Sequence, residues 1–155
     1  MSLEMRARGH HRPLIAVLVW AVLGPWPVPV FAADETVLRP RVPSDQIEEA
    51  RSWSNPFEAT AENIEKGRTL FHGKAFCVTC HGRDGKGFGD IPGLVGKLPR
   101  NFTDKVWQMA RTDGELWWIL RNGSPGTDMA SFVPLVLTED EAWQVVLYVR
   151  SFDRQ

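Results

Sequence analysis

The sequence predicts a mainly helical domain, because three segments begin with recognisable N-terminal capping residues. Thr60 is a good N-cap for a helix that runs to about Phe71 or His72. Thr112 and Thr138 each precede a glutamate by three residues, which is the spacing of a capping box, and apolar residues follow. Several valines in the third segment would by themselves favour a strand, but the capping box and the helical spacing predict a helix.

The first residues predict an export signal. A positively charged stretch that contains Arg6, Arg8 and Arg12 precedes an apolar run over residues 14–23. Small residues then favour cleavage after Ala32. A helical run of about ten residues spans about 15 Å, against roughly 30 Å of bilayer hydrocarbon. We therefore expect a signal peptide over residues 1–32, and no stable membrane insertion after its removal.

Residues 33–59 predict a lead-in arm ahead of a domain over residues 60–155. Prolines interrupt this arm, so a partly ordered tail is an alternative interpretation. We expect a short helix near Asp45, with Asp45 as its cap and Glu48 completing a capping box. We also expect the arm to lie against the domain through three apolar anchors, Ile47, Trp53 and Phe57.

Both cysteines of the chain lie in one short segment, Cys77-Val78-Thr79-Cys80-His81. This pattern is that of a c-type haem attachment site. The two thiols add to the two vinyl groups of one porphyrin, and the same helical turn places the histidine beneath the iron. A thioredoxin-like dithiol would require a preceding strand, and none is predicted. A structural zinc site requires four ligands, and outside the leader only His72 remains as a further histidine.

The sixth iron ligand has three candidates outside the leader, namely Met129, Met109 and His72. Methionine opposite histidine suits an electron carrier, because it raises the reduction potential. Met129 follows a loop with two glycines and a proline, which favours holding its side chain against a flat group, so we predict Met129 as the ligand. Met109 could be core filler, and His72 is more typical of a half-exposed residue at a helix end.

The region from residue 60 to residue 152 resembles the class I monohaem cytochromes c of the bacterial periplasm. The matching segments are the attachment motif, Gly67 with Phe71 and Tyr148 at a helix crossing, the Pro92–Gly96 segment and the Gly126–Met129 loop. The resemblance implies an all-α fold without a sheet, in which about three main helices and loops surround one haem c.

The resemblance also implies the roles of individual residues. Cys77 and Cys80 would form thioether links, and His81 and Met129 would be the axial ligands. Pro92 and Leu94 would belong to the cofactor-binding segment, with the Pro92 carbonyl accepting a hydrogen bond from His81. Many relatives have proline after the axial methionine, whereas this chain has Ala130, so we expect a more labile iron–sulfur bond.

Charge is unevenly distributed along the chain, although 18 basic and 19 acidic residues nearly balance. Residues 66–105 contain eight basic and three acidic residues, a net charge of +5. This positive region could steer the protein to acidic redox partners, or it could be an ordinary solvated surface. The small net charge and the lack of a recognition motif exclude nucleic acid as an expected partner. The glycine-rich segment after His81 lacks the ending of a P-loop, so phosphate binding is not expected.

Taken together, these patterns predict a periplasmic one-electron carrier that is not an enzyme and that meets a redox donor and an acceptor. A haem subunit bound permanently to a periplasmic dehydrogenase or reductase is the first alternative. A haem sensor or peroxidase-like protein, in which Met129 leaves the iron, is the second. Trp117, Trp118 and Phe132 could line the haem crevice, although aromatic residues at helical spacing are more often ordinary core.

Overall fold

The computed structural model describes residues 35–87 and 98–154, which belong to one compact unit. The expected signal peptide with its cleavage after Ala32 lies outside these residues, as do Pro92 and Leu94. Those expectations therefore stay predictions. No helix within residues 35–87 or 98–154 has the length and apolar character needed to cross a membrane.

The described part of the chain is helical and contains no strand, which confirms the all-α prediction. The three expected main helices are α3, α6 and α7, and the remaining helices are short. In chain order the helices are α1 (Glu35–Leu38), α2 (Ile47–Ser52), α3 (Ala61–His72), α4 (Val78–His81), α5 (Lys105–Ala110), α6 (Asp113–Asn122) and α7 (Glu139–Ser151), followed by a 3-10 turn (Phe152–Arg154).

The caps of the three main helices form as predicted. The Thr60 hydroxyl accepts a hydrogen bond from the Asn63 amide at 3.2 Å and caps α3. At α6 the Thr112 hydroxyl accepts from the Glu115 amide at 3.2 Å, while Glu115 accepts from the Thr112 amide at 2.7 Å. The same reciprocal pair occurs at Thr138, which caps α7. Each box satisfies two backbone donors that a helix start leaves without partners.

One expected helix cap does not form, and one short helix was not predicted. A helix does follow Asp45, but its N-cap is Gln46 and no side chain caps it, so the Asp45–Glu48 capping box does not form. The Gln46 amide instead donates to the Pro43 carbonyl in a turn at 3.0 Å, which moves the helix start along the chain. Helix α5 was not predicted; Asp104 caps it by accepting from the amides of Val106 and Trp107.

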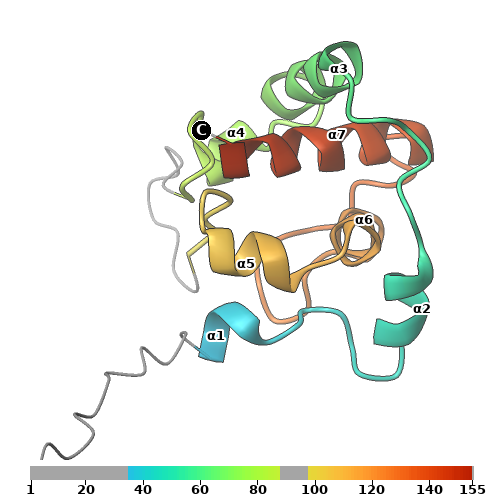
Figure 1. Cartoon of the computed structure of the whole chain (residues 1–155), viewed down its shortest axis with the longest axis vertical. Coiled ribbons are helices and arrows are strands. Elements are labelled where there is room, and N and C mark those ends of the chain that lie inside the picture. Colours follow the sequence, from blue (N-terminus) through green and yellow to red (C-terminus); the bar gives the residue numbers. More distant parts are fainter. Residues whose placement is uncertain (1–34, 88–97, 155) are drawn as a thin grey trace, which may run out of the picture. The chain divides into compact units, whose positions relative to one another are not determined.

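Helices α3 and α7 cross at very short range, as expected from the glycine within α3 (Figure 1). A Cβ atom on Gly67 would overlap with the backbone carbonyl of Gln144 on α7. One turn later, Phe71 packs edge-on against Tyr148, with ring centroids 5.2 Å apart. The missing side chain at Gly67 therefore permits the contact that brings these aromatic residues together.

The arm packs against helix α6 through its own short helix, α2 (Figure 1). Trp53 contacts Trp117 edge-on at 5.2 Å between ring centroids. Ile47 and Phe57, the other expected anchors, also pack against buried apolar clusters. A Cβ on Gly114 would overlap with the Ala50 carbonyl, so this glycine lets the arm approach the α6 backbone.

A buried polar cluster ties helices α5 and α7 together. The Gln108 amide nitrogen donates to the carbonyls of Phe102 at 2.7 Å and Val149 at 2.9 Å. Arg150 donates to the Gln108 side chain at 2.8 Å and to the Asp113 carboxylate at 2.7 Å. These bonds satisfy a buried side chain and fix the start of α6 next to the end of α7.

Replacing Gly67 by alanine tests the helix crossing. We expect Gly67→Ala to destabilise the haem-loaded protein by about 1–3 kcal/mol, because the added methyl group must displace the α7 backbone. Helix propensity alone predicts the opposite sign, a gain of about 1 kcal/mol. Chemical denaturation followed by circular dichroism measures the difference.

Thr69→Ala is the matched control, since Thr69 is exposed on the same helix. We expect its stability to lie within about 0.5 kcal/mol of the wild type. If Gly67→Ala proved as stable as Thr69→Ala, the close crossing would be excluded.

Candidate functional site

The attachment motif forms one helical turn, α4, immediately after a tight reversal that follows α3. Gly73 ends α3, and Phe76 has a positive φ of 49°, which turns the chain toward Cys77. Cys77 is the N-cap residue, and its carbonyl accepts from the His81 amide at 2.9 Å. The histidine therefore lies on the same helical turn as Cys80, a turn that directly follows the cap residue Cys77.

His81 is buried, with 8% of its surface exposed, and one of its ring nitrogens has a partner. Nδ1 lies 3.2 Å from the Arg100 carbonyl oxygen. A carbonyl can only accept, so this contact assigns the ring proton to Nδ1 and leaves the lone pair on Nε2. Burial lowers the pKa of His81 to about 4, although the Arg100 contact opposes that shift. His81 is therefore a neutral imidazole at physiological pH, the form that binds a metal.

The Arg100 carbonyl was not expected as a neighbour of the His81 ring, and its oxygen lies within hydrogen-bond distance of Nδ1. Pro92, whose carbonyl was expected to accept from this ring, lies outside the described residues, so that expectation stays a prediction. Phe102, two residues after Arg100, stacks on the imidazole with ring centroids 4.3 Å apart and so holds the ring plane.

A cavity of about 260 Å³ lies next to His81, and Cys80 and Met129 also line it. Most of the other described residues along its wall are apolar and come from the arm, α5, α6, α7 and the loops beside them. These apolar residues are Val42, Leu98, Pro99, Phe102, Trp107, Leu116, Ile119, Leu120, Ala130, Phe132, Val146 and Val149. A cavity lined mainly by apolar side chains, with polar groups on part of its wall, is typical of a site for a flat organic cofactor.

Met129 is the one of the three ligand candidates that lines this cavity, as judged over the described residues. Its loop is closed by two hydrogen bonds: its carbonyl accepts from the Ser124 amide at 2.9 Å, and its amide donates to the Thr127 hydroxyl at 3.2 Å. Met109, on α5, is 79% exposed. The Nε2 atom of His72 lies 3.0 Å from the Tyr148 hydroxyl, which gives that ring a structural partner.

The two cysteines are free thiols in the structure, and their environment does not suit dithiol redox chemistry. Burial raises the pKa of Cys77 to about 12 and also raises the pKa of Cys80. Reactive dithiols instead have lowered pKa values. Cys80 lines the cavity, whereas Cys77 belongs to the hydrophobic core one turn earlier.

The residues at this site fit a covalently attached haem. An apolar cavity, a neutral histidine with a fixed tautomer, a thioether sulfur and a neighbouring thiol are all present around one space. The zinc alternative lacks support, because no group of three or more His, Cys, Asp or Glu within the described ranges could hold a metal ion.

Several cavity residues were not identified from the sequence. Of the three aromatic residues considered, Phe132 lines the cavity, but Trp117 stacks on Trp143 and Trp118 packs against the arm. The sequence also gave no indication that charged residues would line this space. Those residues are Arg41, Arg100, Arg111, Glu115 and Asp128. Glu115 was identified as a helix cap, but a capping box says nothing about which cavity the helix adjoins.

Comparisons with known proteins agree with this chemistry. The Cytochrome c family model matches residues 64–153. A chain of the reducing HAO-like protein complex Kustc0457/Kustc0458 from Kuenenia stuttgartiensis is 28% identical, with a TM-score of 0.55 over 63% of this chain. That match covers 46% of the solved chain, so the present chain spans less than half of it. The KustC0563 c-type cytochrome is 31% identical, with a TM-score of 0.44, over 56% of this chain and 95% of that one. No curated protein gives a significant match.

Two glycines of the Met129 loop provide a matched test of its geometry. Gly123 and Gly126 have φ values of 80° and 72°, a region that disfavours other residues. A Cβ on Gly123 would lie 2.8 Å from the Met129 carbonyl oxygen, whereas one on Gly126 would meet nothing within 4 Å. We expect Gly123→Ala to destabilise the protein by about 1–3 kcal/mol more than Gly126→Ala, because it also displaces the Met129 backbone. Equal losses in denaturant unfolding would show that Gly123 does not support this loop.

Proposed function

Because the chain belongs to the cytochrome c family, we propose that it is a periplasmic one-electron carrier whose haem iron has His81 and Met129 as axial ligands. Family membership establishes haem-based electron transfer. The observation that carries the ligand assignment is the shared cavity, in which Met129 and His81 both form part of the wall. The exposed side chain of Met109 and the tyrosine contact of His72 support the same choice.

Each residue of the site has a distinct task in this proposal. Cys77 and Cys80 hold the cofactor through thioether links. The Arg100 carbonyl orients His81 and keeps the proton on Nδ1, so Nε2 is available to bind iron. The Thr127 and Ser124 contacts hold the Met129 backbone. Bound haem supplies an iron that accepts and releases one electron, and methionine opposite histidine raises its reduction potential.

We also propose that the chain is exported and is not an enzyme. A leader over residues 1–32 would direct the chain to the periplasm. His81 and Met129 would occupy the two iron positions that the porphyrin leaves open, so no position would remain for a substrate, which suits transfer of electrons between partners. Ala130 follows Met129 where many relatives have proline, so we expect the iron–sulfur bond to be more labile than in those relatives.

A stably bound electron-transfer subunit is the second candidate. The likeness to a chain from a reducing HAO-like protein complex supports it, since that relative belongs to an assembly. The donor or acceptor would then be a permanent partner, and the iron chemistry would be unchanged. The two candidates differ in the lifetime of the contact with the partner protein.

The ligand assignment predicts different results for the two methionines outside the leader. We expect Met129→Ala to keep covalently attached haem but to lower the reduction potential and admit carbon monoxide to the ferrous iron. Met109→Ala is the control, because its exposed side chain lies outside the cavity, and we expect an unchanged spectrum. Optical spectra of both variants, with and without carbon monoxide, measure the difference.

An unchanged spectrum for Met129→Ala would exclude Met129 as the ligand. Carbon monoxide binding to the wild-type protein at neutral pH would instead favour the sensor or peroxidase-like alternative, in which this ligand dissociates.

The lifetime of the partner contact can be tested by purification from the native host. A diffusing carrier should separate from other proteins as a single chain once the salt concentration is raised to about 0.5 M, because screening removes long-range attraction. Co-elution with a fixed set of proteins through that salt step would contradict the free carrier and support the bound subunit.

A further inference from the structure

The arm contributes directly to the cavity, although it precedes the residues matched by the family model. Arg41 and Val42 both line the cavity wall, and Val42 is 5% exposed. The family model begins at residue 64. This part of the cavity wall is therefore an addition of the present chain to the family's shared region.

Several contacts fasten the arm at this position. Arg111 donates to the Val37 carbonyl at 2.8 Å, and the Trp118 indole donates to the Gln46 side chain at 3.1 Å. Ala50 is fully buried, and its carbonyl lies against Gly114 on α6. Hydrogen bonds and packing thus hold the arm residues on either side of Arg41. These contacts fix the position of the Arg41 backbone beside the cavity.

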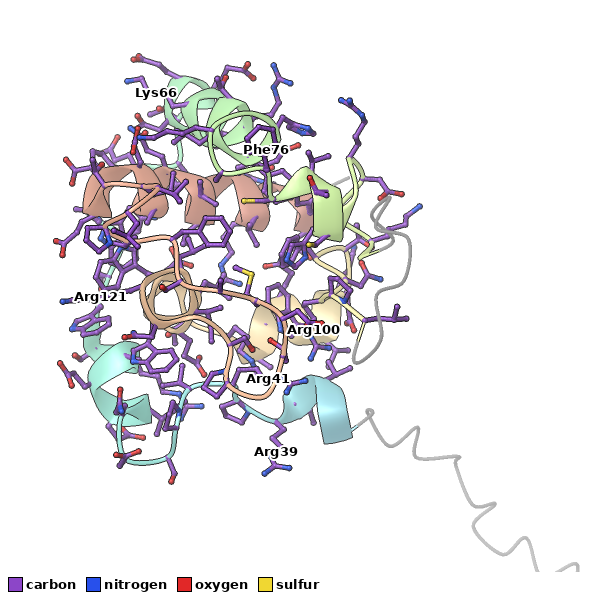
Figure 2. The ribbon with its side chains drawn as sticks, turned by 180° about the vertical axis from the view of Figure 1, so that it is seen from behind. Arg39, Arg41, Lys66, Phe76, Arg100 and Arg121 are labelled. Atoms are coloured by element: carbon purple, nitrogen blue, oxygen red, sulfur yellow. The ribbon has the colours of Figure 1, made fainter. Side chains whose placement is uncertain are left out.

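Three arginines line the cavity, namely Arg41, Arg100 and Arg111, and the first two are near enough to Arg111 for their charges to act on it. Figure 2 shows Arg41 and Arg100 near each other, whereas Arg39 points away from the domain. Arg111 is only 8% exposed, and burial lowers its pKa, with the other arginines adding to that effect and Glu115 opposing it. Like charges held together in a partly buried place favour binding of an anion.

The two carboxylates that line the cavity do not neutralise all of this charge. Glu115 uses one oxygen to cap α6, and its other oxygen lies 3.6 Å from Arg51, outside the cavity wall. Asp128 is exposed in the Met129 loop. Within the described part of the chain, the Arg41 guanidinium forms no hydrogen bond or ion pair. Arg41 therefore has bonding capacity left for a bound anion.

We propose that the arm is a working part of the haem site, in which Arg41 binds a propionate carboxylate of the haem, while Arg100 and Arg111 add positive charge beside it. This inference rests on the proposed function, because it requires haem in this cavity. Arginine binds carboxylates in a forked geometry, which suits two carboxylates on the edge of a flat ring. A positive charge near those carboxylates favours the reduced iron, since it offsets negative charge that would stabilise the ferric state.

The test compares Arg41→Ala with Arg39→Ala in the haem-loaded, full-length protein. Arg39 is the matched control, since it has the same charge, is exposed and lies on the arm outside the cavity wall. For Arg41→Ala we expect the ratio of ferric to ferrous protein at the wild-type midpoint to rise about three- to tenfold. A tenfold change corresponds to a midpoint lower by about 59 mV. Arg39→Ala should remain at the wild-type midpoint, and Arg41→Lys should recover part of the loss.

Equal shifts for Arg41→Ala and Arg39→Ala would overturn the proposal, because they would indicate a distant charge effect rather than a bound carboxylate. An unshifted Arg41→Ala would overturn it as well. Failure of this inference remains distinct from failure of the proposed function. If only this inference fails, every variant still has covalent haem and a low-spin spectrum. If the proposed function fails, the wild-type protein itself lacks them.

Discussion

The close crossing of α3 and α7 at Gly67 is the contact on which the rest of the site depends. It brings Phe71 against Tyr148 and sets the point from which the chain turns into α4. From that turn, His81 reaches the cavity and meets the Arg100 carbonyl. A wider separation of the two helices would move the histidine relative to the wall that α7 contributes. Packing of two helices thereby determines the position of a candidate iron ligand.

Local patterns could be predicted from the sequence where the interaction spans a few residues. The capping boxes at Thr112 and Thr138 depend on a spacing of three residues, so both were predicted correctly. The Asp45 cap was wrong because a turn closed by the Pro43 carbonyl competed with it. Helix α5 is too short for its periodicity to be recognised. The Arg100 carbonyl and the Arg41 side chain could not be predicted at the site, since the fold alone brings them near His81.

The arm changes how the site is understood. As a sequence it is a proline-interrupted segment with a few apolar anchors, which a partly ordered tail could also explain. In the structure it packs on α6, where Gly114 leaves room for it, and lines the cavity with Val42 and Arg41. The same segment combines apolar burial with a positive charge beside the cavity. An extension of the family fold can in this way affect the electrostatics of a shared site without altering the proposed iron ligands.

The central claim is that a haem in this cavity is held between two protein ligands and cycles by one electron. An optically followed redox titration of the wild-type protein under carbon monoxide tests it most directly. We expect one reversible one-electron transition, low-spin spectra in both states, and a midpoint that carbon monoxide does not change at neutral pH. A high-spin ferrous spectrum, or a midpoint that rises with carbon monoxide pressure, would contradict two protein ligands on the iron.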